Sequence, residues 1–256
     1  MDLKLKGKKA IITGATRGIG RAIAETLAAE GADIAICARN KDQVEEAVAA
    51  LKKTGVNVIG GVVDIGDGDA FKKWIVDTGN AMGGIDVLVC NASALANGNG
   101  EDAWTAGFNI DVLGAQRASE AAMPFLEKAA AANGDASITI ISSISAAETS
   151  NANSYGAMKA AQIHFAKGLA REKAVKHVRV NTVSPGTVYF KGGVWDMIET
   201  HMPDIFKASF ARNLMGRMAN PQDIANATVF IASPASSFTT GINLTVDGAF
   251  TARVNF

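Results

Sequence analysis

Residues 13–20 read Thr13-Gly14-Ala15-Thr16-Arg17-Gly18-Ile19-Gly20, a glycine-rich stretch between an apolar run and a helical pattern. The run before it, Lys9–Thr13, is typical of a buried strand, and the helical pattern begins near Gly18. Glycines in such a turn allow a tight bend, a close approach of the backbone to a phosphate and tight helix–strand packing. The helix N-terminus then presents unpaired N–H groups to an anion. The stretch predicts a nucleotide-binding turn, with an ordinary strand–helix turn as the simpler alternative.

The rest of the chain repeats this alternation of a short strand and a longer helix. Continuous runs of Ile and Val predict strands covered on both faces, and the expected strands are Lys9–Thr13, Asp33–Ala38, Val56–Asp64, Ile85–Asn91, Ala136–Ser143, Val178–Val183 and Gly241–Val246. The expected helices are Gly18–Glu30, Lys41–Thr54, Asp67–Ala81, Asp102–Ala132, Asn153–Lys173 and Pro221–Ala232. Strict alternation predicts an α/β fold with a parallel sheet between two layers of helices. Because no linker or internal repeat interrupts the pattern, residues 1–256 are expected to form one domain.

Composition excludes several classes of protein. The 256 residues include 25 basic and 25 acidic side chains, whereas a nucleic-acid binder or a membrane-surface protein would normally carry a basic face. A hydrophobic content of 48% excludes a disordered chain, and two cysteines exclude a disulfide scaffold. No apolar run reaches the roughly 18 residues of a membrane-spanning helix, and the apolar stretch near the N-terminus is too short for a signal peptide. We therefore expect a cytoplasmic protein.

A segment near residues 190–212 fits no strand of the sheet. Its apolar residues are interspersed with acidic ones, which predicts an amphipathic helical lid beside the last strands. Trp195, Phe206 and Phe210 are expected to pack within this lid; if they face the site, the substrate is apolar and more than a few atoms across. Among the histidines, His201 is the candidate for a substrate contact. No metal site is expected, because the histidines and cysteines lack the spacing of metal ligands.

The end of the second expected strand bears on the choice of nucleotide. A site for NAD places an Asp or Glu there to bond the ribose hydroxyls, but this chain has Ala38-Arg39-Asn40. The planar guanidinium of Arg39 matches the oxygens of a 2′-phosphate, and Arg17 in the glycine-rich turn can reach the same group. Two solvated arginines are the simpler alternative. The missing acid and the two arginines together favour NADP(H).

Tyr155 and Lys159 lie four residues apart near the start of an expected helix, so their side chains share one face. An ammonium about 4–5 Å from a phenolate stabilises it by about 4 kcal/mol at an effective dielectric constant of about 20. Tyrosine can then serve as a general acid or base. Ser142 and Ser143 come 13 and 12 residues before Tyr155, where a strand is expected to end. A hydroxyl group there lies at the carboxyl edge of the sheet, where open α/β sheets bind ligands.

These residues resemble the motifs of the short-chain dehydrogenase/reductase family. The resemblance rests on the glycine-rich turn, Asn91-Ala92, Ser143, Tyr155-x-x-x-Lys159 and Pro185-Gly186, and it extends to Val246-Asp247-Gly248. It implies a single Rossmann-type domain with a doubly wound, seven-stranded parallel sheet. It also implies a homodimer or homotetramer whose interface is formed by the helices around residues 102–132 and 153–173.

The resemblance also implies roles for individual residues. Tyr155 exchanges a proton with the substrate oxygen, Lys159 assists it by its charge and bonds the nicotinamide ribose, and a serine holds the carbonyl oxygen. Ser143 is preferred to Ser142 for this role because a small apolar residue follows it. The residues implied to bind the cofactor are Gly14, Thr16, Arg17, Gly18, Ile19, Gly20, Arg39, Asp64, Ile65, Asn91, Ala92, Tyr155, Lys159, Pro185, Gly186, Thr187 and Val188.

Two residues depart from the family's pattern. Ser93 replaces a glycine close to the cofactor, and Asp111 occupies the position of an asparagine that holds a water in the proton relay to the lysine. An ionised aspartate accepts hydrogen bonds but donates none. It can pair with Lys159 and oppose the effect of that charge on the phenol. We expect an altered relay and a retained Tyr–Lys pair.

The resemblance thus implies an NADP(H)-dependent oxidoreductase that interconverts a ketone or aldehyde and an alcohol, with an apolar or cyclic ketone as the expected substrate. A 3-oxoacyl thioester reductase is the alternative within the enzyme class. It needs a basic patch near the site, and the basic residues that stand out are Arg171, Lys173 and Lys176. A catalytically silent scaffold or sensor that binds the cofactor is the alternative outside that class. The joint presence of Ser143, Tyr155 and Lys159 argues against a silent protein.

Overall fold

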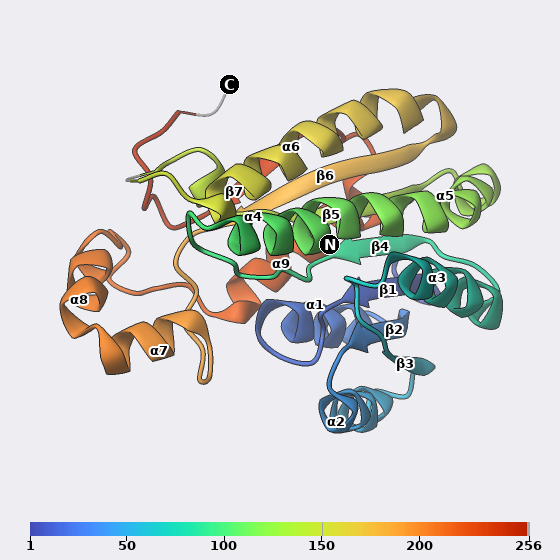
Figure 1. Ribbon diagram of the computed structural model, residues 1–256. Coiled ribbons are helices and arrows are strands. Elements are labelled where there is room, and N and C mark those ends of the chain that lie inside the picture. Colours follow the sequence, from blue (N-terminus) through green and yellow to red (C-terminus); the bar gives the residue numbers. More distant parts are fainter. Residues whose placement is uncertain (150, 255–256) are drawn as a thin grey trace.

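The computed structural model describes residues 1–149 and 151–254 and contains a parallel sheet of seven strands. The strands lie in the order β3-β2-β1-β4-β5-β6-β7 (Figure 1). Their bounds are β1 Lys9–Thr13, β2 Asp33–Ala38, β3 Val58–Val62, β4 Val87–Cys90, β5 Ala136–Ile141, β6 Val178–Pro185 and β7 Asn243–Val246. The chain winds outward from β1 in one direction and from β4 in the other, so the order reverses between these two strands. Open α/β sheets bind ligands at the carboxyl ends of the strands that flank such a switch point.

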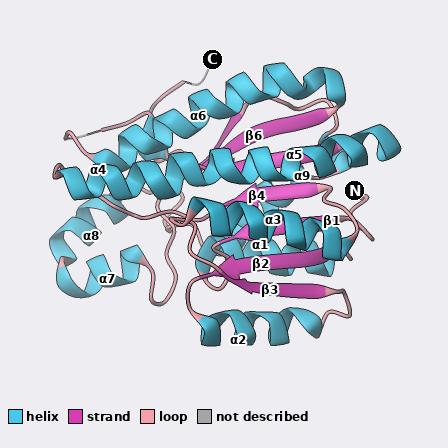
Figure 2. Cartoon of the chain, turned by 45° about the vertical axis from the view of Figure 1, so that its right-hand side comes forward, coloured by secondary structure: helices cyan, strands magenta, loops and turns pink. Residues whose placement is uncertain are grey.

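Helices cover both faces of the sheet (Figure 2). Ile12 belongs to the apolar core on one face and Ile11 to the core on the other, because successive residues of a strand point to opposite faces. The first layer consists of α1 (Gly18–Ala29), α2 (Lys41–Lys52) and α9 (Pro221–Ala232). The second layer consists of α3 (Gly68–Met82), α5 (Leu113–Asn133) and α6 (Ser154–Lys173).

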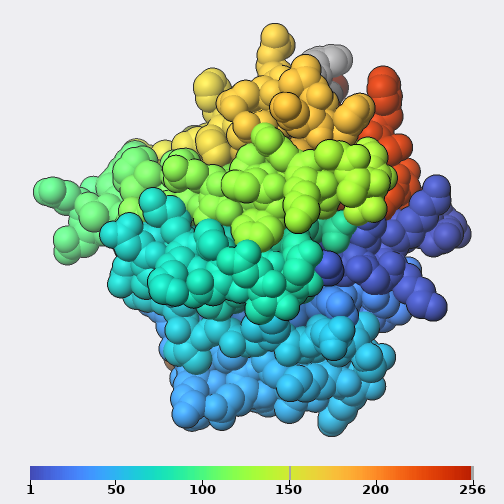
Figure 3. Space-filling view, turned by 90° about the vertical axis from the view of Figure 1, so that its right-hand side faces the viewer, coloured from blue at the N-terminus to red at the C-terminus, as the bar shows by residue number. Residues whose placement is uncertain are grey.

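Two further helical segments lie at the carboxyl edge of the sheet. Helix α4 (Glu101–Gly107) continues through a π-helical turn, Phe108–Val112, into α5. Helices α7 (Val194–His201) and α8 (Pro203–Ala211) project beyond the carboxyl ends of the strands and form the lid (Figure 1). Figure 3 shows the opposite end of the molecule, where the first residues of the chain lie. Within residues 1–149 and 151–254, every helix is too short or too polar to span a bilayer.

The structure confirms the doubly wound sheet, and β1, β2 and α9 have the predicted bounds. The lid is also helical, as predicted. The chain is helical throughout the range predicted over Asp102–Ala132, but the π turn at Phe108–Val112 interrupts its α geometry. Asp111 lies in this wider turn and is buried, with 2% of its side chain exposed. The spacing of apolar residues along the sequence does not indicate a single π turn. The strands predicted at Val56–Asp64 and Ile85–Asn91 are shorter at both ends, because their outer residues enter the adjoining loops.

A buried ion pair fixes α9 to the beginnings of β5 and β6. Arg179 in β6 donates from Nε to Asp135 Oδ1 at 2.6 Å and from Nη2 to Asp135 Oδ2 at 3.1 Å. The same guanidinium donates to the carbonyl oxygens of Ile231, Ala232 and Ser233 at the end of α9. Carbonyl groups at a helix C-terminus lack partners within the helix, and a cation suits the negative end of the helix dipole. The guanidinium therefore serves both the carboxylate and the helix end.

Replacing Arg179 with Met should lower the free energy of unfolding by about 3–5 kcal/mol, because Asp135 would remain buried without its partner. Urea denaturation followed by circular dichroism measures the change. The matched control is Arg21→Met, which breaks a more exposed pair with Glu25 on α1 and should cost less than about 1 kcal/mol. Equal losses in the two variants would contradict the structural role of Arg179.

Candidate active site

The glycine-rich turn between β1 and α1 is locked to the end of β4. Thr13 Oγ1 accepts hydrogen bonds from the backbone N–H groups of Asn91 and Ala92, at 3.0 and 3.1 Å. Asn91 Nδ2 donates to the carbonyl oxygens of Thr13 and Gly14, both at 3.0 Å. Gly14 has a φ of +65°, and a side chain at Gly20 would collide with the Asn91 amide. The turn thus requires glycine where the backbone passes closest to its neighbours.

The start of α1 can hold a phosphate. Arg17 is the N-cap residue, and its side chain makes no capping hydrogen bond within the helix. The first N–H groups of the helix therefore remain available to an anion. This open end, together with the glycine cradle, fits the pyrophosphate of a dinucleotide.

Two exposed arginines flank the cradle. Arg39 directly follows β2, and no acidic residue is present at that strand end. Arg17 precedes α1 and donates from Nη1 to the carbonyl oxygen of Gly192 in the segment that leads to α7, at 3.1 Å. After β3, Asp64 Oδ1 accepts a hydrogen bond from the N–H of Gly66 at 2.9 Å.

The residues expected to bind the cofactor lie along the carboxyl edge of the sheet. This edge is formed by the loops that follow β1, β2, β3 and β4 and by the end of β6. The expected residues on these segments are residues 14–20 after β1, Arg39 after β2, Asp64 and Ile65 after β3, Asn91 and Ala92 after β4, and Pro185, Gly186, Thr187 and Val188 at the end of β6.

Tyr155 and Lys159 lie in the first turns of α6. Asn153 caps this helix, since its side-chain oxygen accepts a hydrogen bond from the N–H of Gly156 at 2.8 Å. Lys159 Nζ lies 5.5 Å from the centroid of the Tyr155 ring and donates to the carbonyl oxygen of Ile141 at 3.1 Å. The ammonium is therefore held between the phenol and the end of β5.

The structure distinguishes the two serines at the end of β5. Ser142 is buried, and its hydroxyl donates to the carbonyl oxygen of Lys159 at 2.9 Å. Ser143 Oγ accepts a hydrogen bond from the N–H of Ser145 at 3.1 Å and lines a cavity of about 250 Å³. Because Ser143 accepts in this bond, its hydroxyl proton stays available to a ligand. Ser142 thus anchors α6, and Ser143 is the serine that a substrate can reach.

Asp111 and Lys159 form a buried ion pair. Asp111 Oδ1 lies 3.0 Å from Lys159 Nζ, and each side chain is 2% exposed. Asp111 Oδ2 accepts a hydrogen bond from the N–H of Ala94 at 2.9 Å, and the carbonyl oxygen of Asp111 accepts one from Gln162 Nε2 at 2.8 Å. The pairing expected from the sequence is present, so an anion faces the ammonium that also faces the phenol. Gln162 was not expected at the site, although it lies one turn after Lys159 on the same helix.

The lid packs on itself and is tied to the rest of the site. Phe206 contacts three other rings at centroid distances of 6.1 to 6.5 Å, which belong to Tyr189, Trp195 and Phe210. Thr187 Oγ1 donates to Asn213 Oδ1 at 2.8 Å and so joins the end of β6 to the end of the lid. The aromatic residues are therefore packing residues of the lid, as expected.

The two cysteines have no place in the site's chemistry, whereas a substrate contact by His201 stays a prediction. Burial raises the pKa of Cys37 and of Cys90 to about 12, so both stay neutral thiols. His201 is exposed in the last turn of α7, and His164 and His177 are exposed as well.

Comparison with known proteins assigns the chain to a family. A sequence profile described as enoyl-(acyl carrier protein) reductase matches residues 14–251. Isoepoxydon dehydrogenase patN from Penicillium expansum is 34% identical, and the match covers 98% of each chain. A tropinone reductase homolog from Arabidopsis thaliana is 33% identical over 97% of this chain and 94% of its own.

Solved structures show the same fold. L-sorbose reductase from Gluconobacter frateurii, complexed with NADPH and L-sorbose, superposes with a TM-score of 0.90 at 30% identity and covers 99% of this chain and 100% of its own. A 7α-hydroxysteroid dehydrogenase complexed with NADH gives a TM-score of 0.89 at 30% identity, over 99% of this chain and 98% of its own. With its glycine cradle, its Tyr–Lys pair and these matches over nearly its whole length, the chain belongs to the short-chain dehydrogenase/reductase family.

Proposed function

We propose that this chain is an NADP(H)-dependent oxidoreductase that interconverts a ketone or aldehyde and an alcohol, with an apolar or cyclic ketone as substrate. The observation that carries the proposal is the placement of Tyr155, Lys159 and Ser143 at the carboxyl edge of the sheet, beside a cradle that fits a dinucleotide. Membership of the family supports an oxidoreductase of alcohol and carbonyl groups. We further propose one domain over residues 1–256, a cytoplasmic location and a homodimer or homotetramer.

The residues of the chain divide the work of orientation and proton transfer. Tyr155 gives a proton to the carbonyl oxygen during reduction and takes it back during oxidation. Ser143 donates a hydrogen bond to the same oxygen and so fixes its position. Lys159 keeps a positive charge beside the phenol and stabilises the phenolate that remains when the proton leaves. Hydride is what the nicotinamide supplies when it is bound, and the protein provides the orientation.

The preference for NADPH rests on Arg39 and Arg17. Arg39 follows β2 in the place where an acidic residue would bond a ribose hydroxyl, and a guanidinium matches a 2′-phosphate there. Similar structures hold NADPH in one case and NADH in another. The proposed preference for NADPH over NADH therefore rests on residues of this chain.

The substrate proposal rests on the size and sides of the cavity at Ser143. Its volume of about 250 Å³ lies below the roughly 300–1,000 Å³ of typical ligand pockets, which favours a small substrate of about one ring. Ile144 and Ala147 give the cavity an apolar side.

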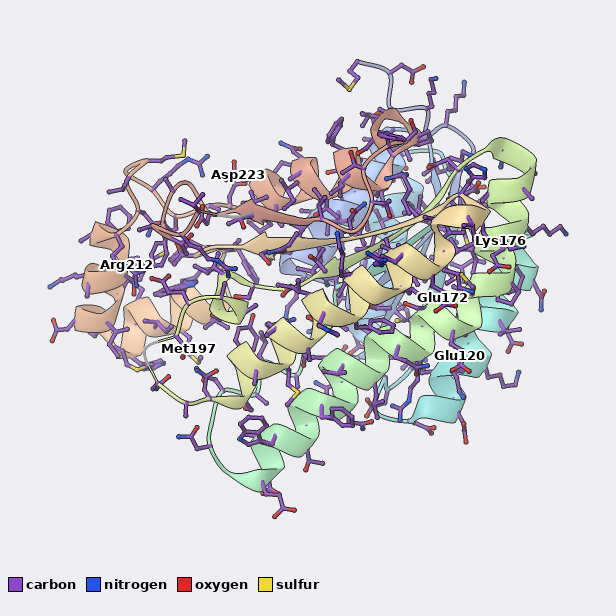
Figure 4. The ribbon with its side chains drawn as sticks, turned by 90° about the horizontal axis from the view of Figure 1, so that it is seen from above. Glu120, Glu172, Lys176, Met197, Arg212 and Asp223 are labelled. Carbon is purple, nitrogen blue, oxygen red and sulfur yellow. The ribbon has the colours of Figure 1, made fainter. Side chains whose placement is uncertain are left out.

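A 3-oxoacyl thioester reductase is the second candidate, because the description of the matching family profile names a reductase of acyl thioesters, although one that acts on an enoyl C=C bond. Its carrier would need a basic patch at the site entrance. Lys173 lies instead at the far end of α6, about 27 Å from Tyr155 at 1.5 Å per helical residue, and Lys176 lies beyond it in a 3₁₀ turn. Figure 4 shows Lys176 and the lid residue Arg212 at opposite ends of the molecule. Lys173 is also paired with Glu127 and Glu172, so this cluster does not serve the site.

Tyr155→Phe should lower kcat for a ketone substrate by about 10²- to 10⁴-fold, the usual contribution of a general acid, and leave the Kd for NADPH nearly unchanged. Steady-state kinetics and a fluorescence titration measure the two quantities. The chain offers a matched control, because Tyr189 is the other of its two tyrosines. Tyr189→Phe should keep most of the turnover. An equally active Tyr155→Phe would refute the proposed acid, and inactivity of both wild type and variant would favour the silent scaffold.

Arg39→Ala should raise the Kd for NADPH by about 10- to 100-fold and leave the Kd for NADH within about twofold, since hydrogen bonds to charged groups contribute about 1.5–3 kcal/mol. Equilibrium titration of both cofactors checks this. Lys52→Ala, at the far end of α2, serves as the control for loss of a surface charge. The NADP preference is wrong if the unaltered protein binds both cofactors equally.

Asp111→Asn should keep activity and move the acid limb of the kcat/KM profile to lower pH. Without the carboxylate, the Lys159 ammonium acts on the phenolate unopposed and stabilises it more strongly. The profile of NADP⁺ reduction with a secondary alcohol measures the shift. Asp77→Asn removes a carboxylate from an exposed pair with Lys73 and should leave the profile in place. If kcat/KM depends on pH in the same way in the wild type and in Asp111→Asn, Asp111 takes no part in the proton relay.

A further inference from the structure

Polar side chains take part in the lining of the cavity beside Ser143. Three segments form it: the loop after β5, strands β6 and β7, and the C-terminal turn that follows β7. Its apolar members are Ile144, Ala147 and Ala252, and the other lining residues carry hydroxyl, amide, carboxylate or guanidinium groups. Polar groups in a ligand pocket fix the orientation of the ligand and provide specificity. Those of this cavity indicate a ligand with polar substituents.

Asn243 presents hydrogen-bond donors from the sheet side of the cavity. Its Oδ1 accepts hydrogen bonds from Thr182 Oγ1 at 2.9 Å and from Ser184 Oγ at 2.7 Å. In this orientation the two hydroxyl groups donate to the amide oxygen, and the NH₂ group points away from them. Within the part of the chain that the structure describes, Asn243 Nδ2 donates to no protein partner. The amide thus offers two N–H donors to a ligand in the cavity.

The C-terminal turn is held over the cavity by a small network. Asp247 Oδ2 accepts hydrogen bonds from the N–H of Thr251 at 3.0 Å and from its hydroxyl at 2.7 Å. The Arg212 guanidinium lies 4.1 Å from the centroid of the Phe250 ring and 2.7 Å from Glu148 Oε1. Arg212 therefore joins the lid, the loop after β5 and the C-terminal turn. Figure 4 shows this residue on the lid.

Arg253 adds a cation to the cavity. It follows the turn, lines the cavity and is exposed. Among residues 1–149 and 151–254 it takes part in no ion pair, whereas the other charged residue of the lining, Glu148, is paired with Arg212. Its guanidinium is thus available to a ligand.

The mixture of groups selects one kind of substituent. Asn243 and Arg253 donate, whereas Ser143 and Glu148 have oxygen atoms that accept. A hydroxyl group both donates and accepts, so it satisfies both sets. An alkyl group would shield the Asn243 amide from water without bonding it, which is costly. An ionised carboxylate has no donor and would leave the accepting oxygen atoms of Ser143 and Glu148 without a partner.

We propose that the substrate is a hydroxylated cyclic ketone, with its carbonyl oxygen at Ser143 and Tyr155 and a hydroxyl group in the cavity against Asn243 and Arg253. The inference rests on the proposed function, since it takes carbonyl reduction at Tyr155 as given. Asn243 and Arg253 then determine specificity, because they contact a substituent of the substrate and not the reacting carbonyl.

The test compares 2-hydroxycyclohexanone with cyclohexanone in the NADPH-loaded protein. The kcat/KM of the hydroxyketone should be at least about tenfold higher, since two added hydrogen bonds each contribute several-fold. Equal values, or a preference for cyclohexanone, would overturn the inference and leave the oxidoreductase in place.

Arg253→Met should lower the ratio of the two kcat/KM values about fivefold, through the KM of the hydroxyketone. Arg253 lies on the exposed tail, so the variant should fold, and Arg253→Lys should retain most of the ratio because it keeps a cationic donor. Arg171→Met, at the far end of α6, is the matched control and should leave the ratio unchanged. A ratio that is the same in Arg253→Met and in Arg171→Met would exclude Arg253 from the substrate site.

Ligand binding to the Tyr155→Phe variant tests the polar subsite separately from the proposed carbonyl reduction. Calorimetry with NADPH present should show tighter binding of 2-hydroxycyclohexanone than of cyclohexanone. If the wild-type protein turns over neither ketone but this difference in binding remains, the proposed reduction of these ketones fails and the polar subsite stands. Turnover of both ketones without a difference in binding would overturn the subsite alone.

Discussion

A cation and an anion are buried in contact at the point where α6, the π turn before α5 and the end of β5 meet. Removing two charges from water is costly unless each finds its partner in good geometry. Lys159 and Asp111 are 3.0 Å apart, Lys159 also donates to the carbonyl oxygen of Ile141, and Asp111 accepts from the N–H of Ala94. Three segments far apart in the sequence must therefore be in register before the pair can form. Tyr155 lies on the same helix as Lys159, so the ion pair also sets the position of its phenol.

The parallel sheet brings the other groups of the site to the same edge as this ion pair. All seven strands end at one edge, so the glycine cradle after β1, the serine after β5 and the lid after β6 meet there without long loops. Asn91 ties the cradle to β4 through the carbonyl groups of Thr13 and Gly14, and Ser142 ties α6 to the end of β5. The groups assigned to proton transfer thus stand on rigid elements, which orientation of a substrate requires. The lid and the C-terminal turn, which Arg212 joins, lie outside these elements.

The sequence predicted the sheet well because buried parallel strands show as uninterrupted Ile and Val runs, and because Gly14 and Gly20 are required where the backbone passes closely. It also indicated the pairing of Asp111 with Lys159, which follows from charge and from position in the family pattern. It did not indicate the π turn, since one wide turn leaves the apolar spacing nearly unchanged. Nor did it indicate Gln162 or the polar subsite. Asn243 and Arg253 become neighbours of Ser143 only through the packing of β7 and the tail, and no spacing along the chain records that contact.

The central claim is that the groups at this edge of the sheet catalyse the reduction of a carbonyl group by NADPH. The direct measurement is NADPH oxidation by the purified protein with a panel of cyclic ketones, aryl ketones, aldehydes and 3-oxoacyl thioesters. The account predicts turnover, greatest with a cyclic ketone and weak or absent with the thioesters. Silence across the panel, in protein shown by titration to bind NADPH, would contradict it and leave a cofactor-binding scaffold in its place.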